Sequence, residues 1–159
     1  MKSTLNISGF LLGLLLISCS TVKILPDKIN HIRQKVASKN FTIQVNYANP
    51  LRGSQIYLTS DYELKIKNDS AFAYLPYFGE AFVALYGSSE GGIQFRKPVH
   101  NYKMEPMNKN LGWNIHFRVK SDYTTYDFSI QIFRNGQSDF TVTSFDKDAI
   151  SFSGALKDD

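Results

Sequence analysis

Apolar and polar residues alternate with a period of two through most of the chain, a pattern typical of half-buried β-strands. The alternation is clearest over residues 113–120 and 126–132, where every second residue is aromatic or β-branched. The pair Asn135-Gly136 follows. Because both central residues of a type I′ turn need a positive φ, this pair predicts a tight hairpin into a partner strand at 140–142.

Shorter alternating stretches predict further strands, at residues 41–47, 62–67, 72–74, 93–95, 102–105 and 150–152. Turn-forming pairs such as Asn49-Pro50 and Asn68-Asp69 separate them, and connections this short favour antiparallel pairing. We therefore predict one mainly β domain of about eight strands, either an antiparallel β-sandwich or a half-open barrel. Both architectures produce the same alternation, so the pattern does not choose between them.

One short amphipathic helix is predicted before the first strand, over residues 27–38. Ile29, Ile32 and Val36 recur at helical spacing, and Asp27 can cap free N–H groups at the start. We expect this helix to cover an open end or an edge of the sheet. Docking on a membrane surface is the alternative.

Residues 1–18 have the organisation of an export signal. Lys2 supplies a positive charge, and residues 7–17 form an apolar run of eleven residues. A run of this length is too short to cross about 30 Å of hydrocarbon as a helix, so it predicts a signal peptide and not a transmembrane segment.

The four residues from Leu16 to Cys19 (LISC) resemble a lipobox, which implies that Cys19 receives a diacylglyceryl thioether and becomes the first mature residue. An ordinary secretory signal with a chance cysteine and an uncleaved anchor are the alternatives. Several acyl chains on one residue anchor a protein stably. We expect a lipidated tether at 19–26 and a single domain at 27–159.

Ser20 follows the cysteine and no acidic cluster comes after it. By resemblance to known sorting signals, this predicts an outer-membrane lipoprotein whose domain faces the periplasm, and surface exposure stays open as an alternative.

The composition argues against some classes of function and of structure. The net charge of +4 is not concentrated in any run of Lys or Arg, so we expect no nucleic-acid partner. Hydrophobic residues make up 43% and charged residues 20% of the chain, which is an ordinary globular mixture. With one cysteine, no disulfide can form within the chain.

Catalytic motifs are weak. The run Gly87 to Gly91 (GSSEG) matches the G-x-S-x-G pattern, but a strand follows it where a nucleophile elbow needs a helix, so we interpret it as a flexible turn. A hydrolase using Ser89 or His116 would need these side chains beside a carboxylate. We therefore expect no enzyme activity.

Metal-binding patterns are weak as well. The histidines His31, His100 and His116 have no partner at ligand spacing, and we expect no metal and no cofactor. The acidic residues Asp146 and Asp148 flank Lys147 in what we interpret as a solvated turn.

An aromatic and glycine-rich segment between residues 74 and 95 is the most unusual stretch of the chain. Core and turn packing is the favoured interpretation of this segment, and a ligand or partner surface is the alternative; the candidate residues are Tyr74, Pro76, Tyr77, Phe78, Gly79, Tyr86, Gly91 and Gly92.

This arrangement, Leu-Pro-Tyr-Phe-Gly from Leu75, then Tyr-Gly from Tyr86, then Gly-Gly-Ile-Gln-Phe from Gly91, resembles a family of Bacteroidota envelope proteins known as domain of unknown function 4251. The Trp113 strand and the closing Ile150–Gly154 segment also resemble it. The resemblance spans about residues 28–157 and implies export with an unknown role. It supplies no catalytic residues.

A further resemblance is local. Asp69-Ser70-Ala71 is similar to the acceptor sequence for O-glycosylation of exported proteins in some bacteria of the Bacteroides group, which would require an exposed Ser70.

The sequence thus favours a lipid-anchored binding or structural module. The partner is the membrane, through the anchor, together with an unknown protein. The alternative is a carrier of a small apolar ligand, in a barrel cavity lined by Tyr74, Phe78, Phe82, Phe117 and Phe128.

Overall fold

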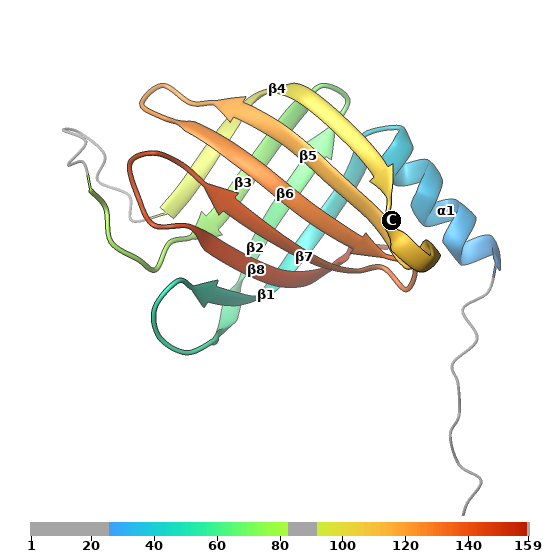
Figure 1. Ribbon diagram of the computed structural model, residues 1–159, viewed down its shortest axis with the longest axis horizontal. Coiled ribbons are helices and arrows are strands. Elements are labelled where there is room, and N and C mark those ends of the chain that lie inside the picture. The colour runs from blue at the N-terminus through green and yellow to red at the C-terminus, as the bar shows by residue number, and fades with distance from the viewer. Residues whose placement is uncertain (1–25, 83–91, 159) are drawn as a thin grey trace, which may run out of the picture.

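Eight antiparallel strands close into a barrel in the computed structural model, which describes residues 26–82 and 92–158 (Figure 1). The elements are α1 (Pro26–Ala37), β1 (Asn40–Pro50), β2 (Ile56–Lys67), β3 (Ser70–Pro76), β4 (Gly92–Pro106), the 3₁₀ turn η2 (Asn108–Asn110), β5 (Gly112–Lys120), β6 (Thr125–Phe133), β7 (Gln137–Thr143) and β8 (Ile150–Leu156).

Pairing between the first and last strands closes the barrel. β1 pairs with β8 from Ile43 opposite Leu156 to Pro50 opposite Ile150, and every other strand pairs with its neighbours along the chain. The prediction of a mainly β antiparallel fold with one helix is confirmed. Of the two architectures left open, the structure is the barrel, and it is closed, not half-open.

β4 corrects the prediction of two separate strands at 93–95 and 102–105. It is one strand of 15 residues, whose first half pairs with β3 and whose second half pairs with β5. The register shifts between His100 and Lys103, where Asn101 has a φ of 55°. The alternation breaks there because the strand bulges as it exchanges one neighbour for the other.

Aromatic rings fill the middle of the barrel. Phe117 and Phe128 stack with their ring centroids 4.8 Å apart, and Phe95 packs edge-on against Phe128 at 5.9 Å. Phe140 and Phe152 pack against each other at 5.1 Å. An eight-stranded barrel is just wide enough for its own side chains to fill, so this packing makes the interior a core.

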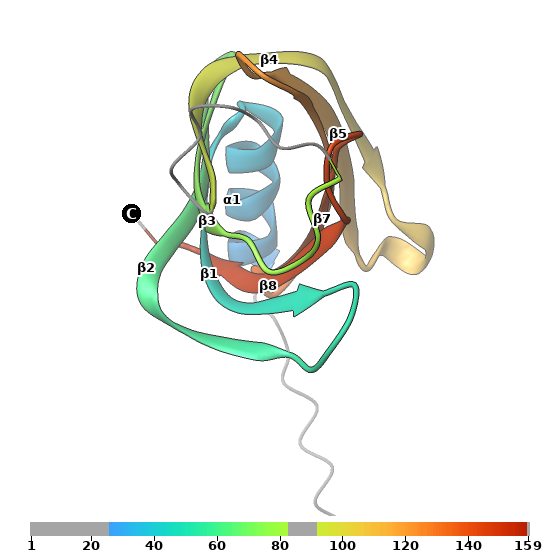
Figure 2. The same cartoon turned by 90° about the vertical axis from the view of Figure 1, so that its left-hand side faces the viewer.

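Helix α1 covers one end of the barrel, which we call the helix end. Figure 2 looks along the barrel and shows α1 behind the ring of strands. Ile32 and Val36 are buried, and the Tyr102 hydroxyl donates a hydrogen bond to the Val36 carbonyl oxygen at 3.0 Å. The helix predicted at 27–38 is thereby confirmed to within one residue at each end, and so is its place over an open end.

The hairpin between β6 and β7 forms as predicted, but its turn type was wrong. Gly136 has a φ of 90°, whereas Asn135 is not among the residues with a positive φ. Three residues, 134–136, connect the strands, and the Gly136 N–H donates to the Phe133 carbonyl oxygen at 2.9 Å. The extra residue Arg134 lengthens the loop beyond the two residues of a type I′ turn.

Candidate functional site

The candidate residues of the aromatic and glycine-rich segment lie in different environments in the structure. Tyr74 is exposed on the outside of β3, where its ring stacks on that of Tyr62 at 5.1 Å. Pro76 is buried at the end of the strand. At Gly92 a Cβ atom would lie 2.7 Å from the Leu75 carbonyl oxygen, so the backbones approach closely there.

Two of these candidate residues, Tyr86 and Gly91, lie outside the described residues, as does the GSSEG run with Ser89.

Tyr77, Phe78 and Gly79 belong to segment 77–82, which runs across the barrel end opposite α1 (Figure 2). We call this the loop end. The Tyr77 hydroxyl lies 2.9 Å from the Glu80 carbonyl oxygen and 3.2 Å from that of Asp148. Tyr77 therefore serves to dock the segment, whereas Phe78 is partly exposed.

Backbone pairing holds segment 77–82 against the loop between β7 and β8. The Phe82 N–H donates to the Asp146 carbonyl oxygen at 2.7 Å, and the Asp148 N–H donates to the Glu80 carbonyl oxygen at 2.9 Å. Ala81 forms an isolated antiparallel bridge with Lys147. These contacts close the loop end, and we call them, together with the buried Asp146 carboxylate, the clasp.

The expectation that residues 146–148 form a solvated turn was wrong. The Asp146 side chain is 1% exposed and accepts a hydrogen bond from the Thr124 hydroxyl at 2.6 Å. The Lys147 ammonium lies 3.7 Å from the carboxylate, and 5.1 Å from the centre of the Tyr77 ring. The carboxylate is buried where the Thr124 hydroxyl, from the β5–β6 loop, and the neighbouring Lys147 ammonium satisfy it, which a local sequence pattern does not reveal.

Burial and hydrogen bonding shift the pKa of Asp146 in opposite directions. Burial alone would raise its pKa, but hydrogen bonds from Thr124, Ser144 and its own backbone N–H, together with Lys147, outweigh burial and lower the pKa. Burial, helped by the nearby Asp146 charge, raises the pKa of Tyr126 to about 12. The clasp thus holds a charged carboxylate beside a neutral tyrosine.

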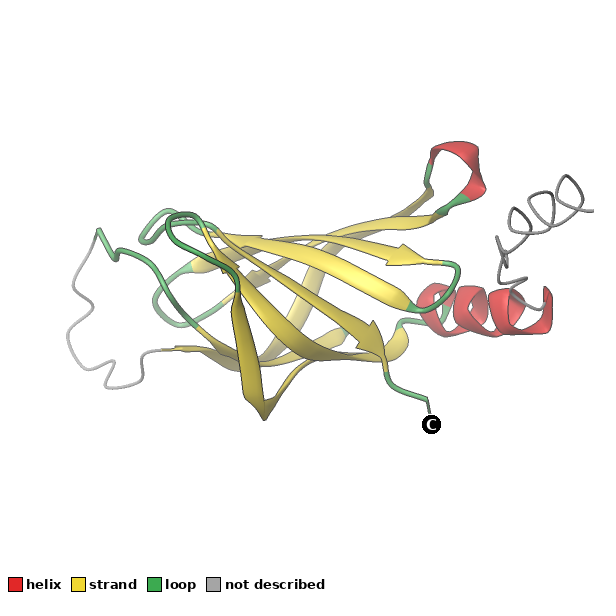
Figure 3. Cartoon of the chain, turned by 90° about the horizontal axis from the view of Figure 1, so that it is seen from below, coloured by secondary structure: helices red, strands yellow, loops and turns green. Residues whose placement is uncertain are grey.

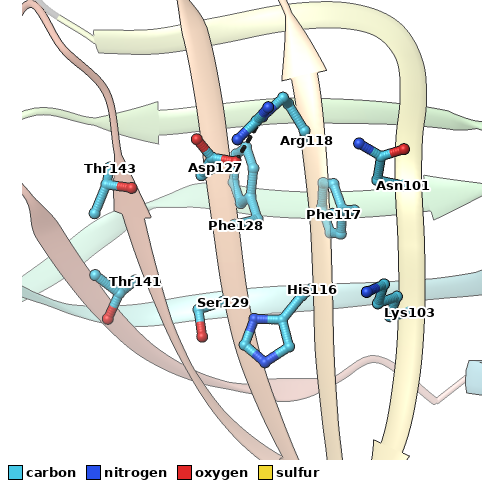
Figure 4. A pocket seen from close by; sticks show the side chains of 10 residues that line it. All are labelled: Asn101, Lys103, His116, Phe117, Arg118, Asp127, Phe128, Ser129, Thr141 and Thr143. Carbon is cyan, nitrogen blue, oxygen red and sulfur yellow. Dashed lines mark hydrogen bonds and ion pairs between the residues drawn. The ribbon is translucent and has the colours of Figure 1, made fainter.

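A groove with polar and apolar lining crosses the outside of the barrel. Its first part has a volume of about 290 Å³ and lies over β4 to β7 (Figure 4). A second hollow of about 500 Å³ continues it toward β8 and β1, and both hollows share Ser129 and Thr141. We call the two hollows together the outer groove.

The strand register explains the outer groove. His116, Ser129, Thr141 and Ser151 lie opposite one another on successive strands, which places a row of polar side chains along the groove. Thr141 and Ser151 share a hydrogen bond of 2.8 Å. Over β6 to β8 the row itself is uncharged and offers hydroxyl donors and acceptors, and Asp127 and Asp139 flank it.

The outer groove does not form a catalytic triad. Of the two carboxylates that line it, Asp127 is paired with the Arg118 guanidinium at 2.7 Å. The other, Asp139, lies opposite Gln131 and Ser153, outside the row that contains His116. Within the described residues, no hydrogen bond joins His116 to Ser129 and no cluster of three potential metal ligands occurs. His31 and His100 are exposed elsewhere on the surface.

A third hollow, of about 460 Å³, lies at the helix end between α1 and the hairpin of β4 and β5. Figure 3 shows this hairpin, with η2 at its tip, and α1 at the same end of the barrel. Apolar side chains and two guanidinium groups line the hollow together; its residues are Ile29, Asn30, Arg33, Ala37, Met104, Pro106, Asn110, Gly112, Trp113 and Arg134. We call it the helix-end hollow.

The five residues proposed to line a carrier cavity do not come together. Phe117 and Phe128 face inward and stack on each other, whereas Tyr74, Phe78 and Phe82 are exposed. Ser70 begins β3 and is half-buried beside the exposed Asp69, which pairs with Lys39 at 2.7 Å. Over the described residues, no helix combines the length and the apolar character needed to cross a membrane.

Sequence reasoning did not identify the outer groove or the helix-end hollow. Both are assembled across elements far apart in the chain. The alternation placed His116 and Ser129 on the polar side of their strands, but only the register aligns them with Thr141. Arg134 lies in the turn between β6 and β7, where no sequence pattern marked it as part of a site. Its backbone N–H donates to the Leu111 carbonyl oxygen at 3.1 Å.

Taken together, the chain is a closed antiparallel barrel with a filled interior and its hollows on the outer surface. It belongs to the family described as domain of unknown function (DUF4251), which matches residues 26–156. A crystal structure of a DUF4251 family protein from Bacteroides eggerthii DSM 20697 is similar in fold, with a TM-score of 0.63 and 14% identity over 82% of this chain and 87% of that one. Comparison with curated proteins gives no match.

Proposed function

We propose that the protein is a lipid-anchored module of the cell envelope that binds a partner on the outer surface of its barrel and catalyses no reaction. The lipobox-like sequence ending at Cys19 supports the anchor. Residues 20–25 link that cysteine to α1, and a link of this length reaches about 25 Å when fully extended. The proposal therefore holds the barrel close to the membrane, in the periplasm, with surface display as the other orientation.

The filled interior is the observation that carries the binding role. Stacked aromatic rings occupy the middle of the barrel, α1 covers one end, and the clasp closes the other. A carrier needs an interior cavity with an entrance, whereas a rigid closed barrel is a scaffold for an outer surface. The packing thus favours the binding module over the carrier of an apolar ligand.

Within this proposal, the outer groove is the face that meets the partner. Its hydroxyl-bearing row is held by paired strands, so a partner can form hydrogen bonds there with little ordering cost. A strand scaffold presents Ser129, Thr141 and Ser151 at fixed spacing, which supplies specificity.

Intact-mass analysis of the detergent-extracted native protein tests the anchor. We expect the mass of residues 19–159 plus acyl chains, and loss of the lipid in Cys19→Ala. A mature mass without lipid would contradict the anchor. Additional mass that disappears in Ser70→Ala would establish a glycan, and co-extracted apolar molecules would support the carrier instead.

Site-specific photocrosslinking in whole cells tests the outer groove. A benzoylphenylalanine at Ser129 should give a discrete crosslinked species, and the same group at Gln94, an exposed position on the first half of β4, should not. Equal crosslinking at both positions, or none at Ser129, would contradict the assignment of this face.

A further inference from the structure

The helix-end hollow combines an apolar wall with positive charge. Ile29 and Met104 are half-buried beside it, and Trp113 is largely buried. Arg33 from α1 and Arg134 from the β6–β7 turn line the same hollow. A cavity with this division of chemistry suits a molecule that has an anionic group at one end and hydrocarbon at the other.

The two arginines are available for an anion. Within residues 26–82 and 92–158, neither guanidinium has a carboxylate partner, and no Asp or Glu lines the hollow. By contrast, Arg52 and Arg118, elsewhere on the barrel, each pair with a carboxylate at 2.7 Å. Guanidinium groups bind phosphate through paired charge-assisted hydrogen bonds, which makes a phosphate the matching anion.

The hollow is built from three separate parts of the chain, and hydrogen bonds fix them. The Met107 N–H donates to the Gly112 carbonyl oxygen at 2.9 Å, which closes the tip of the β4–β5 hairpin. At this tip Lys109 and Asn110 have φ values of 56° and 60°, a left-handed conformation that is uncommon outside glycine. The β6–β7 turn is tied to the same hairpin through Arg134.

We propose that the helix-end hollow binds an anionic membrane lipid, with its phosphate at Arg33 and Arg134 and the start of its acyl chain against Met104 and Trp113. This inference rests on the proposed lipid anchor, because a tether that begins before α1 brings the helix end, and not the loop end, to the membrane surface. The bound lipid then fixes the orientation of the barrel, which attachment through Cys19 alone does not.

Trp113 is the only tryptophan of the chain, so its fluorescence reports on the hollow directly. The experiment uses residues 20–159, which retain α1 and all eight strands and lack the lipidated cysteine. This chain is titrated below micellar concentrations with dihexanoyl phosphatidylglycerol, with dihexanoyl phosphatidylcholine, and with inorganic phosphate as a competitor.

We expect a saturable change in Trp113 fluorescence with phosphatidylglycerol and at least tenfold weaker binding of phosphatidylcholine. Arg33→Gln and Arg134→Gln should each weaken phosphatidylglycerol binding about tenfold. Arg52→Gln, at the loop end, is the matched control and should leave binding unchanged. Circular dichroism of each variant checks that the surface substitutions leave the barrel folded.

Equal binding of both lipids, no saturable change, or arginine variants that behave like Arg52→Gln would overturn the proposal. Displacement by inorganic phosphate at the same concentration as the lipid would also overturn it, since the apolar wall would then contribute nothing. Because this chain lacks Cys19, these outcomes are independent of the intact-mass result that tests the anchor.

Discussion

The two ends of the barrel are closed by different chemistry. At the helix end, α1 buries Ile32 and Val36 over the opening, so apolar burial supplies most of the stabilisation. At the loop end, segment 77–82 is held by backbone pairing and by the Asp148 carboxylate, which accepts from the Glu80 N–H at 3.3 Å. The buried Asp146 carboxylate of the same loop accepts from the Thr124 hydroxyl. One closure depends on the hydrophobic effect, whereas the other depends on hydrogen bonds and charge.

The different chemistry of the two ends indicates which end responds to pH and which end can bind a ligand. The clasp contains Asp146, whose pKa is lowered by its hydrogen bonds and by Lys147. Protonation of this carboxylate in acid should therefore loosen the loop end first. At the helix end, the buried side chains of α1 are Ile32 and Val36, which do not titrate, and an amphiphilic hollow lies beside the helix. Changes made at one end should therefore leave the properties of the other largely intact.

The largest expected effect is at the clasp. Asp146→Ala removes the acceptor of the Thr124 hydroxyl and leaves the partly buried Lys147 without its carboxylate, so we expect a loss of about 3 kcal/mol in the free energy of unfolding. Urea denaturation at pH 7 measures it. Asp139→Ala, on the exposed face of β7, is the control and should change stability by less than about 0.5 kcal/mol.

At the helix end, Val36→Ala should cost about 2 kcal/mol, because it removes two methyl groups from a fully buried site. The same denaturation assay applies, with the exposed Gln34→Ala as the helix control. A loss for Val36→Ala no greater than that for Gln34→Ala would show that α1 is not part of the folded core.

The dependence of stability on acid pH should distinguish the contributions of the two ends. The folded pKa of Asp146 is lowered, so its contribution to stability is present above the unfolded pKa near 4 and is lost as pH falls through the folded value. Urea midpoints at pH 7, 5 and 3 should show this loss in the wild type and in Val36→Ala. In Asp146→Asn the loss of stability between pH 7 and pH 3 should be smaller than in the wild type. If the variant loses as much stability as the wild type, groups other than Asp146 cause the acid sensitivity.

The smallest effect concerns one tyrosine at each end. Burial raises the pKa of Tyr102 and of Tyr126 to about 12. Stability should therefore fall between pH 10 and 12, because the unfolded chain releases these protons first. Absorbance at 295 nm should show late ionisation of both, and Tyr102→Phe or Tyr126→Phe should each remove one late step. Loss of the Tyr102 hydrogen bond to Val36 should cost about 1 kcal/mol.

The sequence predicted the helix and most of the strands because their periodicity is local, although β2 begins at Ile56, six residues before the predicted stretch. Strand β5, for example, buries Trp113, Ile115, Phe117 and Val119 as the alternation predicted. Closure into a barrel depends on β1 meeting β8, a pairing between distant segments that alternation does not encode. The bend in β4 was missed because one strand serves two neighbours.

The site was harder to predict than the fold. Asp146 was assigned to solvent because an acidic residue in a turn is usually exposed, yet Thr124 and Lys147 make its burial favourable. Tyr77 was a candidate for a binding surface, with packing as the favoured interpretation, and its hydroxyl docks segment 77–82. Aromatic residues between strands are typical of packing and of binding surfaces alike. Only the contacts that they make in the structure distinguish the two roles.

The central claim is that the helix end faces the membrane, and quenching by brominated lipids tests it most directly. The lipidated protein is reconstituted into vesicles that contain brominated phosphatidylglycerol, and the fluorescence of Trp113 is compared with that of a Trp113→Phe, Phe145→Trp variant, whose indole lies in the exposed loop of the loop end. We predict strong quenching of Trp113 and little quenching of the variant. Stronger quenching of the variant, or equal quenching of both proteins, would contradict the account.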